Sequence, residues 1–144
     1  MTILELMVGH HRQCDDAFAK LENLVAGNDW SNPGAFEEFF SIMTKHFQAE
    51  EEVLFAAVEK KMGGPIGPTQ VMRQEHQQMS NLMGQMKEAF GAKDQKKFLS
   101  VSDTWMVIAQ QHNMKEEEIL YPMMDDALRE DTAAVINKTK ELLS

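Results

Sequence analysis

The chain has 144 residues, the length of one domain, and we expect a single domain over residues 1–144. Its 43% hydrophobic and 26% charged residues are typical of globular proteins and exclude long disordered or collagen-like structure. The formal net charge of −9 argues against nucleic acid and anionic membranes as main partners, because both attract positive charge.

The chain has one cysteine, Cys14, which excludes an internal disulfide and any CxxC metal or redox motif. A lone cysteine favours a reducing compartment. Residues 1–8 contain Glu5 and lack a basic segment followed by a long apolar core, so they do not resemble a signal peptide. No stretch approaches the ~18 uncharged apolar residues of a membrane span. We therefore expect a cytoplasmic protein that does not bind membranes.

Glycine and proline are concentrated at a few breaks, and the segments between them are rich in strong helix formers. The first segment predicts a helix over residues 3–26, with Thr2 as its N-cap and Gly27 at its end. The second predicts a helix over residues 33–62, which follows Asn32 as N-cap and has a proline in its first position.

The second half of the chain predicts a third helix over residues 68–90 and a fourth over residues 95–121. Pro122 kinks or restarts the fourth helix, and a short tail helix follows over residues 131–143. No segment alternates with period two, so no strands are expected. Four long helices joined by short loops predict an all-α, up-down-up-down four-helix bundle with a short C-terminal helix.

Each of the four long segments carries apolar residues spaced by three and four positions, the spacing of one buried helix face. Each face also contains one histidine where a hydrophobic residue is expected, although the chain has only five histidines. Burying these imidazoles without partners would cost several kcal/mol, whereas a metal centre would satisfy them together. On the fourth helix the face comprises Trp105, Ile108, Ala109, His112, Glu116, Ile119, Leu120 and Met123.

Residues 46–55 and 112–121 share the pattern HxxxEEE[VI]L[FY], an internal repeat. In each copy the histidine and the first glutamate are four residues apart and lie on the same helix face, so they can bind one ion or bridge two. The other glutamates of the two copies are expected to form a solvated acidic flank. They are Glu51, Glu52, Glu117 and Glu118.

The candidate ligands are therefore His11, His46, Glu50, His76, His112 and Glu116. The absence of a thiolate cluster disfavours a structural zinc site, and imidazole with carboxylate suits iron ahead of manganese or zinc. Six ligands from four helices are too many for one ion that keeps an open position. They suit two ions bridged by carboxylates.

The ordered set of motifs resembles the hemerythrin-like, or HHE cation-binding, domain family over nearly the whole chain. The matching pieces are residues 4–12, His46xxxGlu50, Glu75-His76, and His112xxxGlu116 followed by Leu120-Tyr121-Pro122. The resemblance implies a helical bundle around a non-haem di-iron centre with carboxylate or oxo/hydroxo bridges. It also implies that the four histidines are terminal ligands and that Glu50 and Glu116 bridge the ions.

Two positions depart from the family pattern. Oxygen-carrying hemerythrins have a second histidine one turn after the first on the third helix, but here that position is Ser80. The site is thus one imidazole short, which argues against simple oxygen carriage and suggests an open position or a water ligand. Ala56 stands where family members often have proline, and we expect it to straighten the second helix.

Three residues of the first helix have alternative roles. His10 and His11 compete for one ligand position, and we favour His11 because His10 lies about 100° away from the apolar face. Asp15 can bind the metal or hold the His11 ring, with a partly buried surface role favoured over ligation. Cys14 can be redox-active near the metal, with an inert core role favoured.

We expect the centre to react with a small diatomic ligand or with peroxide, in a monomer or weak homodimer that acts as sensor, scavenger or redox protein. The alternatives are an iron donor or store, for example in iron–sulfur repair, and a metal-free structural bundle. No nucleophile–base set of the hydrolase kind and no glycine-rich phosphate loop is present.

Overall fold

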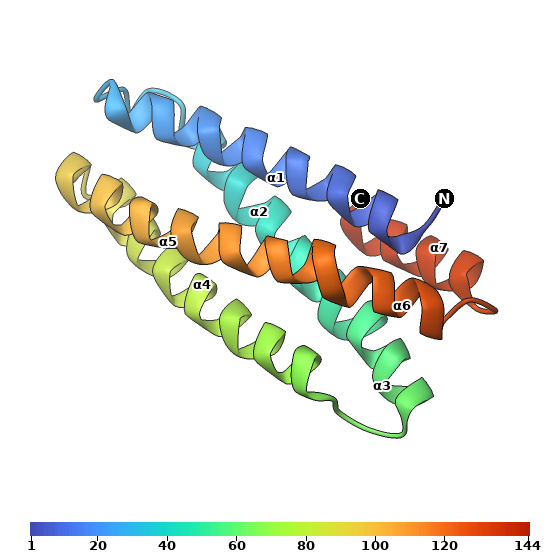
Figure 1. Ribbon diagram of the computed structural model, residues 1–144. Helices are drawn as coiled ribbons and strands as arrows, with labels where there is room; N and C mark the ends of the chain where they lie inside the picture. Colours follow the sequence, from blue (N-terminus) through green and yellow to red (C-terminus); the bar gives the residue numbers. More distant parts are fainter.

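The computed structural model describes residues 1–144, which form helices joined by short loops, with no strand (Figure 1). Two of the long helices contain an internal π-helical segment, labelled η1 and η2. In chain order the elements are α1 (Ile3–Ala26), α2 (Pro33–Ala49), η1 (Glu50–Phe55), α3 (Ala56–Met62), α4 (Gly67–Gly91), α5 (Gln95–Lys115), η2 (Glu116–Leu120), α6 (Tyr121–Ala127) and α7 (Thr132–Leu143).

The helix ends follow the predicted signals. The Thr2 hydroxyl accepts a hydrogen bond from the backbone N–H of Glu5 (3.0 Å), as an N-cap does. Asp94 caps α5 by accepting from the N–H of Lys97 (3.1 Å). Gly63 ends α3 with φ of 86°, a left-handed conformation that glycine adopts without strain.

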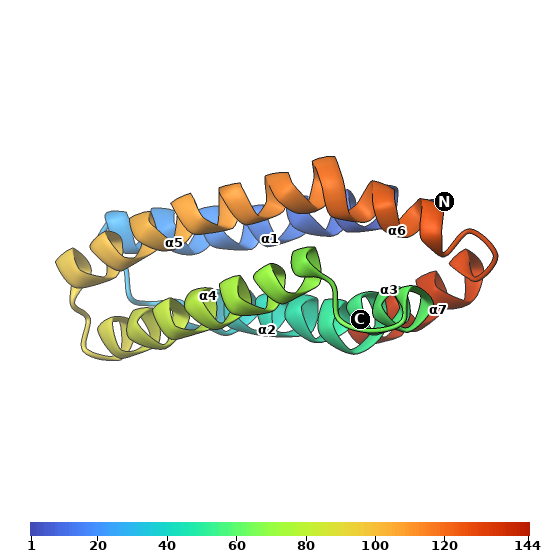
Figure 2. The same cartoon turned by 60° about the horizontal axis from the view of Figure 1, so that its bottom comes forward.

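The helices form the predicted up-down-up-down bundle, and Figure 2 shows it as two layers. One layer contains α1 and the continuous helix of α5, η2 and α6. The other contains α4 and the continuous helix of α2, η1 and α3. The tail helix α7 packs against α2 and η1, and Lys45 Nζ on α2 donates to the carbonyl of Ser144 at its end (3.1 Å).

The core consists of two apolar clusters. The larger one contains Phe18, Phe39 and Trp105, with the Phe18 and Trp105 rings stacked at 4.9 Å. The smaller one contains Leu54 and Tyr121 and lies toward the chain termini. On each of the four long helices a buried histidine lies between these clusters, and the second and fourth of these helices add a buried glutamate, Glu50 and Glu116. A buried polar layer therefore divides the core.

The predicted core face of the fourth helix is only partly right after Glu116. Leu120 is buried as predicted, but Ile119 is 59% exposed, and Tyr121 and Met124 are buried although they were not expected on this face. A π-helical turn contains one residue more than an α-helical turn, so η2 rotates the following residues by one position. The same turn places Pro122 in the first turn of α6, where its missing N–H is tolerated.

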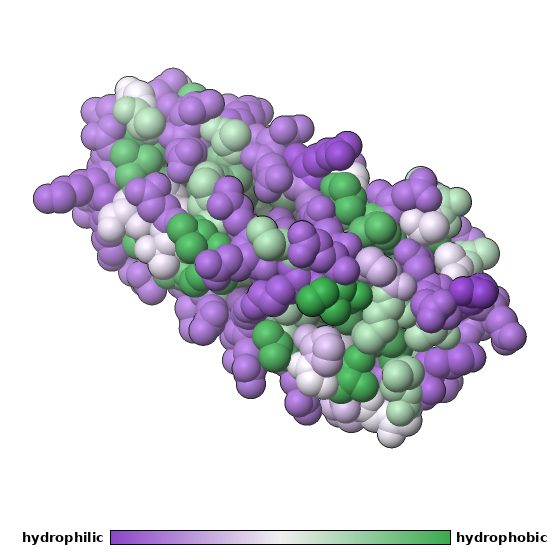
Figure 3. Space-filling model, in the orientation of Figure 1, coloured by the Kyte–Doolittle hydropathy of each residue, from purple (hydrophilic) through white to green (hydrophobic).

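The second helix shows the same irregularity, because η1 directly precedes Ala56. An alanine in place of proline thus does not give the regular α-helix that the sequence suggested at this point. The face of the molecule in Figure 3 is mainly hydrophilic, with groups of hydrophobic side chains between the polar ones. None of the helices combines the length and apolarity needed to span a bilayer.

Candidate metal centre

The structure brings all six predicted ligands together in the buried polar layer, and none is more than 3% exposed. Their donor atoms form two overlapping groups, each with all atoms within 4.8 Å of one another. One group is Glu50, His76, His112 and Glu116, and the other is His11, His46 and Glu116. Four helices contribute, since α1 and α4 each supply one histidine.

The first copy of the repeat forms one half of this layer. The Oε1 atom of Glu50 lies 3.1 Å from Nε2 of both His46 and His76. Glu51, the next residue, contacts the opposite nitrogen of the His76 ring, with Oε2 2.8 Å from Nδ1. Phe55 covers that ring, with centroids 5.7 Å apart. The π-helical turn that begins at Glu50 thus presents two successive carboxylates to one histidine.

The second copy repeats this arrangement with the histidine of α1. The Oε1 atom of Glu116 lies 3.2 Å from Nε2 of both His11 and His112. Glu117 Oε2 is 2.6 Å from Nδ1 of His11. Tyr121 packs on the His11 ring at 5.7 Å and, unlike Phe55, carries a hydroxyl, which donates to Glu50 Oε2 at 2.5 Å. The layer therefore has approximate two-fold symmetry.

The remaining two histidines also have a partner on Nδ1. The Nδ1 atom of His112 lies 2.9 Å from Oε1 of Glu75, whose other oxygen is paired with Lys115. The Nδ1 atom of His46 lies 2.7 Å from Nδ1 of His10, and the two rings stack with centroids 5.0 Å apart. All four candidate ligand histidines thus direct Nε2 into the layer and are held from outside through Nδ1.

Opposite charges in this layer shift the pKa values of the titrating groups. Burial lowers the pKa of His11 and His76, but their hydrogen bonds to Glu116 and Glu50 outweigh it and raise each to about 9. The pKa of His112 is also raised, by the charge of Glu116 acting against burial. Burial raises the pKa of Glu50, but the charge of His46 and bonds to its neighbours hold it well below its ordinary value. Glu50 therefore stays ionised and attracts positive charge, whether protons or metal ions.

Three buried polar atoms in the layer have no hydrogen-bond partner: His46 Nε2, His112 Nε2 and Glu116 Oε2. The two nitrogens are close to carboxylate oxygens, but the alignment is not that of a hydrogen bond. Buried polar atoms in folded proteins almost always have a partner. Imidazole nitrogens and carboxylate oxygens around a common point are ligands that iron, manganese and zinc accept, so the residues present fit a metal centre.

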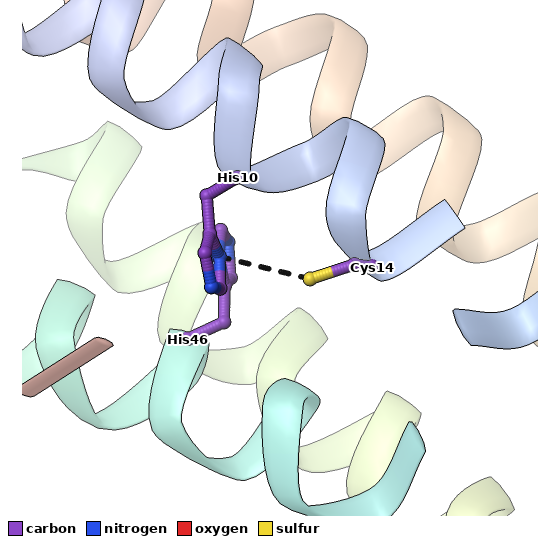
Figure 4. Close-up of side chains that lie close together, drawn as sticks. All are labelled: His10, Cys14 and His46. Carbon is purple, nitrogen blue, oxygen red and sulfur yellow. Dashed lines mark hydrogen bonds between the residues drawn. The ribbon is translucent and has the colours of Figure 1, made fainter. Parts of the chain in front are cut away.

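His10 is buried, contrary to the expectation that it lies off the inner face. The helix α1 packs against both α2 and α5, so more than one narrow stripe is covered. His10 and Cys14 lie beside His46, with Cys14 Sγ 3.7 Å from His10 Nδ1 (Figure 4). Burial and the nearby His46 and His11 lower the pKa of His10 to about 4, and burial raises that of the Cys14 thiol. Cys14 is part of the larger apolar cluster and is held as a thiol.

The groups that contact the Nδ1 atoms of the histidines were the part of the site least predictable from the sequence. The sequence predicts that Glu51 and Glu117 belong to a solvated flank, but both are partly buried, and only Glu52 and Glu118 of the four are exposed. Glu117 takes the place beside the His11 ring that was considered for Asp15, which is exposed. The signal for Glu51 and Glu117 is their position directly after a candidate ligand glutamate in both copies of the repeat.

Two surface hollows reach the layer. One of about 260 Å³ is lined by His76, Glu51 and Ser80, at the position where the oxygen-carrier pattern has a second histidine. The other, of about 550 Å³, lies between α1 and α5 and is also lined by Glu117, which contacts His11. It carries four carboxylates, those of Asp15, Glu22, Glu117 and Glu118.

Comparison with protein families matches residues 2–139 to the hemerythrin HHE cation binding domain. Comparisons with curated proteins and with solved structures each found no match. The family match covers nearly the whole chain, and the buried histidine and glutamate cluster is a site that can hold metal cations. The chain belongs to the hemerythrin HHE cation-binding domain family.

Proposed function

We propose that this chain holds two iron ions and reacts with dioxygen, nitric oxide or peroxide, as a sensor, scavenger or small redox protein. His11, His46, Glu50, His76, His112 and Glu116 would hold the ions. Bound ferrous iron supplies an electron that can pass to a small oxidant. The observation that carries the proposal is the set of unpartnered imidazole and carboxylate atoms in a fully buried layer.

Two ions are supported by the division of the layer into halves. Each half has one carboxylate facing two imidazole Nε2 atoms, around Glu50 in one and Glu116 in the other. The two donor groups, one of four residues and one of three, share Glu116, and each offers enough donors to hold one ion. A shared carboxylate is a suitable bridge between ions in a helical bundle.

The chain contributes orientation and exclusion of water. Glu51, Glu75 and Glu117 hold three of the ligand rings through Nδ1, which fixes Nε2 as the nitrogen that faces the ions. The two apolar clusters close the layer from both ends of the bundle. Access for small molecules is left beside His76, through the hollow that Ser80 lines.

The proposal is tested with iron-loaded, reduced protein that is mixed with dioxygen, nitric oxide or hydrogen peroxide in separate anaerobic experiments. We expect at least one of them to change the near-ultraviolet and visible spectrum in a stoichiometric reaction. Ser80→Phe fills the hollow and is expected to slow this reaction without lowering iron content. Ser100→Phe is the matched control, because Ser100 is also exposed but lies on α5 and does not line the hollow. An iron-loaded protein inert to all three reagents would contradict the proposal.

A second candidate function, iron donation or storage, is favoured by the acidic groove between α1 and α5. Its carboxylates lead to Glu117, which contacts the ligand His11, and negative charge concentrates cations. The two functions differ in how firmly iron is held. Rapid loss of ferrous iron to a chelator, slowed when Glu118 is changed to Gln, supports donation, whereas retention through repeated oxidation and reduction supports the redox function.

A further inference from the structure

The approximate symmetry of the metal layer extends to the residue that precedes each lone histidine. On α4, His76 contacts the carboxylates of the first repeat, while Glu75 holds His112 of the second. On α1, His11 contacts the carboxylates of the second repeat, and the preceding residue, His10, holds His46 of the first. His10 thus occupies the position equivalent to Glu75.

We propose that His10 is a positioning residue for His46 and that its imidazole, in place of a carboxylate, makes the two halves of the metal centre unequal. The inference rests on the proposed metal centre. It gives a role to His10, the only one of the five histidines that is not a candidate ligand.

The contact between the two histidines contains one shared proton. Their Nδ1 atoms are 2.7 Å apart, so one ring donates and the other accepts. When His46 binds an ion through Nε2, its Nδ1 carries the proton and donates, and His10 Nδ1 accepts. Figure 4 shows the planes of the two rings nearly parallel, and the angle between them is 4°. His10 therefore fixes both the tautomer and the plane of the His46 ring.

The two halves differ in the charge of the accepting group. A carboxylate acceptor makes a stronger hydrogen bond than a neutral one and makes the imidazole that donates to it a stronger metal ligand. Glu75 provides such an acceptor for His112, although it shares its charge with Lys115. His10 provides a neutral acceptor for His46. The ion beside His46 is consequently bound more weakly and has the higher reduction potential.

The test is anaerobic titration of the apoprotein with ferrous iron, followed by Mössbauer spectroscopy of protein loaded with ⁵⁷Fe. The wild-type protein is expected to bind two ions with different affinities and to show two iron environments. His10→Ala removes the acceptor and is expected to lower the affinity for one ion by roughly 10- to 100-fold, while the affinity for the other ion is unchanged. His10→Gln is expected to restore binding, because its amide oxygen can accept from His46, and circular dichroism checks that both variants fold.

His10→Glu copies the Glu75 half and is expected to bring the two affinities and the two spectral environments closer together. Cys14→Ala is the control for the thiol, which lies 3.7 Å from His10 and would be a ligand if His10, Cys14 and His46 formed a site of their own. We expect Cys14→Ala to leave iron binding unchanged, and loss of an ion would overturn the proposal.

The outcomes separate this inference from the proposed function. A wild-type protein that binds no iron contradicts the metal centre itself. A wild-type protein with two bound ions, together with a folded His10→Ala variant that binds both as tightly, contradicts only the role of His10. Equal spectral environments in the wild-type protein contradict the inequality of the two halves.

Discussion

The hydroxyl of Tyr121 offers a quantitative test of the buried layer, because a single atom can be removed there. It donates to Glu50 Oε2 at 2.5 Å and lies 3.2 Å from His11 Nε2 in a fully buried position. Tyr121→Phe keeps the ring that packs on His11 and leaves Glu50 with one donor fewer. A hydrogen bond to a charged group contributes about 1.5–3 kcal/mol. We expect apoprotein, prepared by chelation, to lose about this much free energy of unfolding.

For a chain of this length each kcal/mol changes the Tm by about 2–4 °C, so Tyr121→Phe should lower it by roughly 3–12 °C. Thermal unfolding followed by circular dichroism measures the change. We expect a smaller difference after metal loading, since a bound cation also compensates the charge of Glu50. Tyr121→Leu removes the ring as well and should destabilise the protein further. A Tyr121→Phe apoprotein as stable as the wild type would refute the reasoning, because the hydroxyl would then make no net contribution.

Three further predictions concern the ligands, the pH and the metal. His46→Ala or Glu116→Ala should lower both the iron content and the Tm, because bound metal stabilises the folded state. The control variant Glu118→Ala, at an exposed position nearby, should change neither quantity. Elemental analysis measures the iron content and calorimetry measures the Tm. In apoprotein the pKa values of His11 and His76 are about 9, above the ordinary 6.5. The protonated rings therefore stabilise the folded state fully below about pH 6.5, and this stabilisation is lost as the pH rises through 9. Urea unfolding at pH 6 and pH 9.5 should therefore show a lower free energy of unfolding at the higher pH, and equal values would contradict the shifts. Chelation of the loaded protein should lower its Tm, and re-addition of iron should restore it, whereas an unchanged Tm would show that the ion does not stabilise the fold.

The helices could be predicted from the sequence because their ends carry local signals. Thr2, Gly27 and Asp94 lie at or next to the observed ends of α1 and α5, and the Gly63-Gly64 pair lies between α3 and α4. The two repeats could be found because histidine and glutamate four residues apart share a helix face, which is a local property. Their convergence follows from four apolar faces meeting in one bundle.

Other features depend on the tertiary structure and left little trace in the sequence. The π-helical segments η1 and η2 shift the register by one position, which is why Ile119 was placed in the core although it is exposed. The contact of Glu75 with His112 joins α4 to α5 and has no fixed spacing along the chain. The burial of His10 depends on the packing of α1 against two helices at once.

The most direct test of the account is the iron content of the protein after anaerobic reconstitution with ferrous salt and removal of unbound metal. The buried layer, with its two halves around Glu50 and Glu116, predicts about two irons per chain by elemental analysis. A wild-type protein that is folded and still retains no iron would contradict the metal centre and leave the unpartnered nitrogens of His46 and His112 without an explanation.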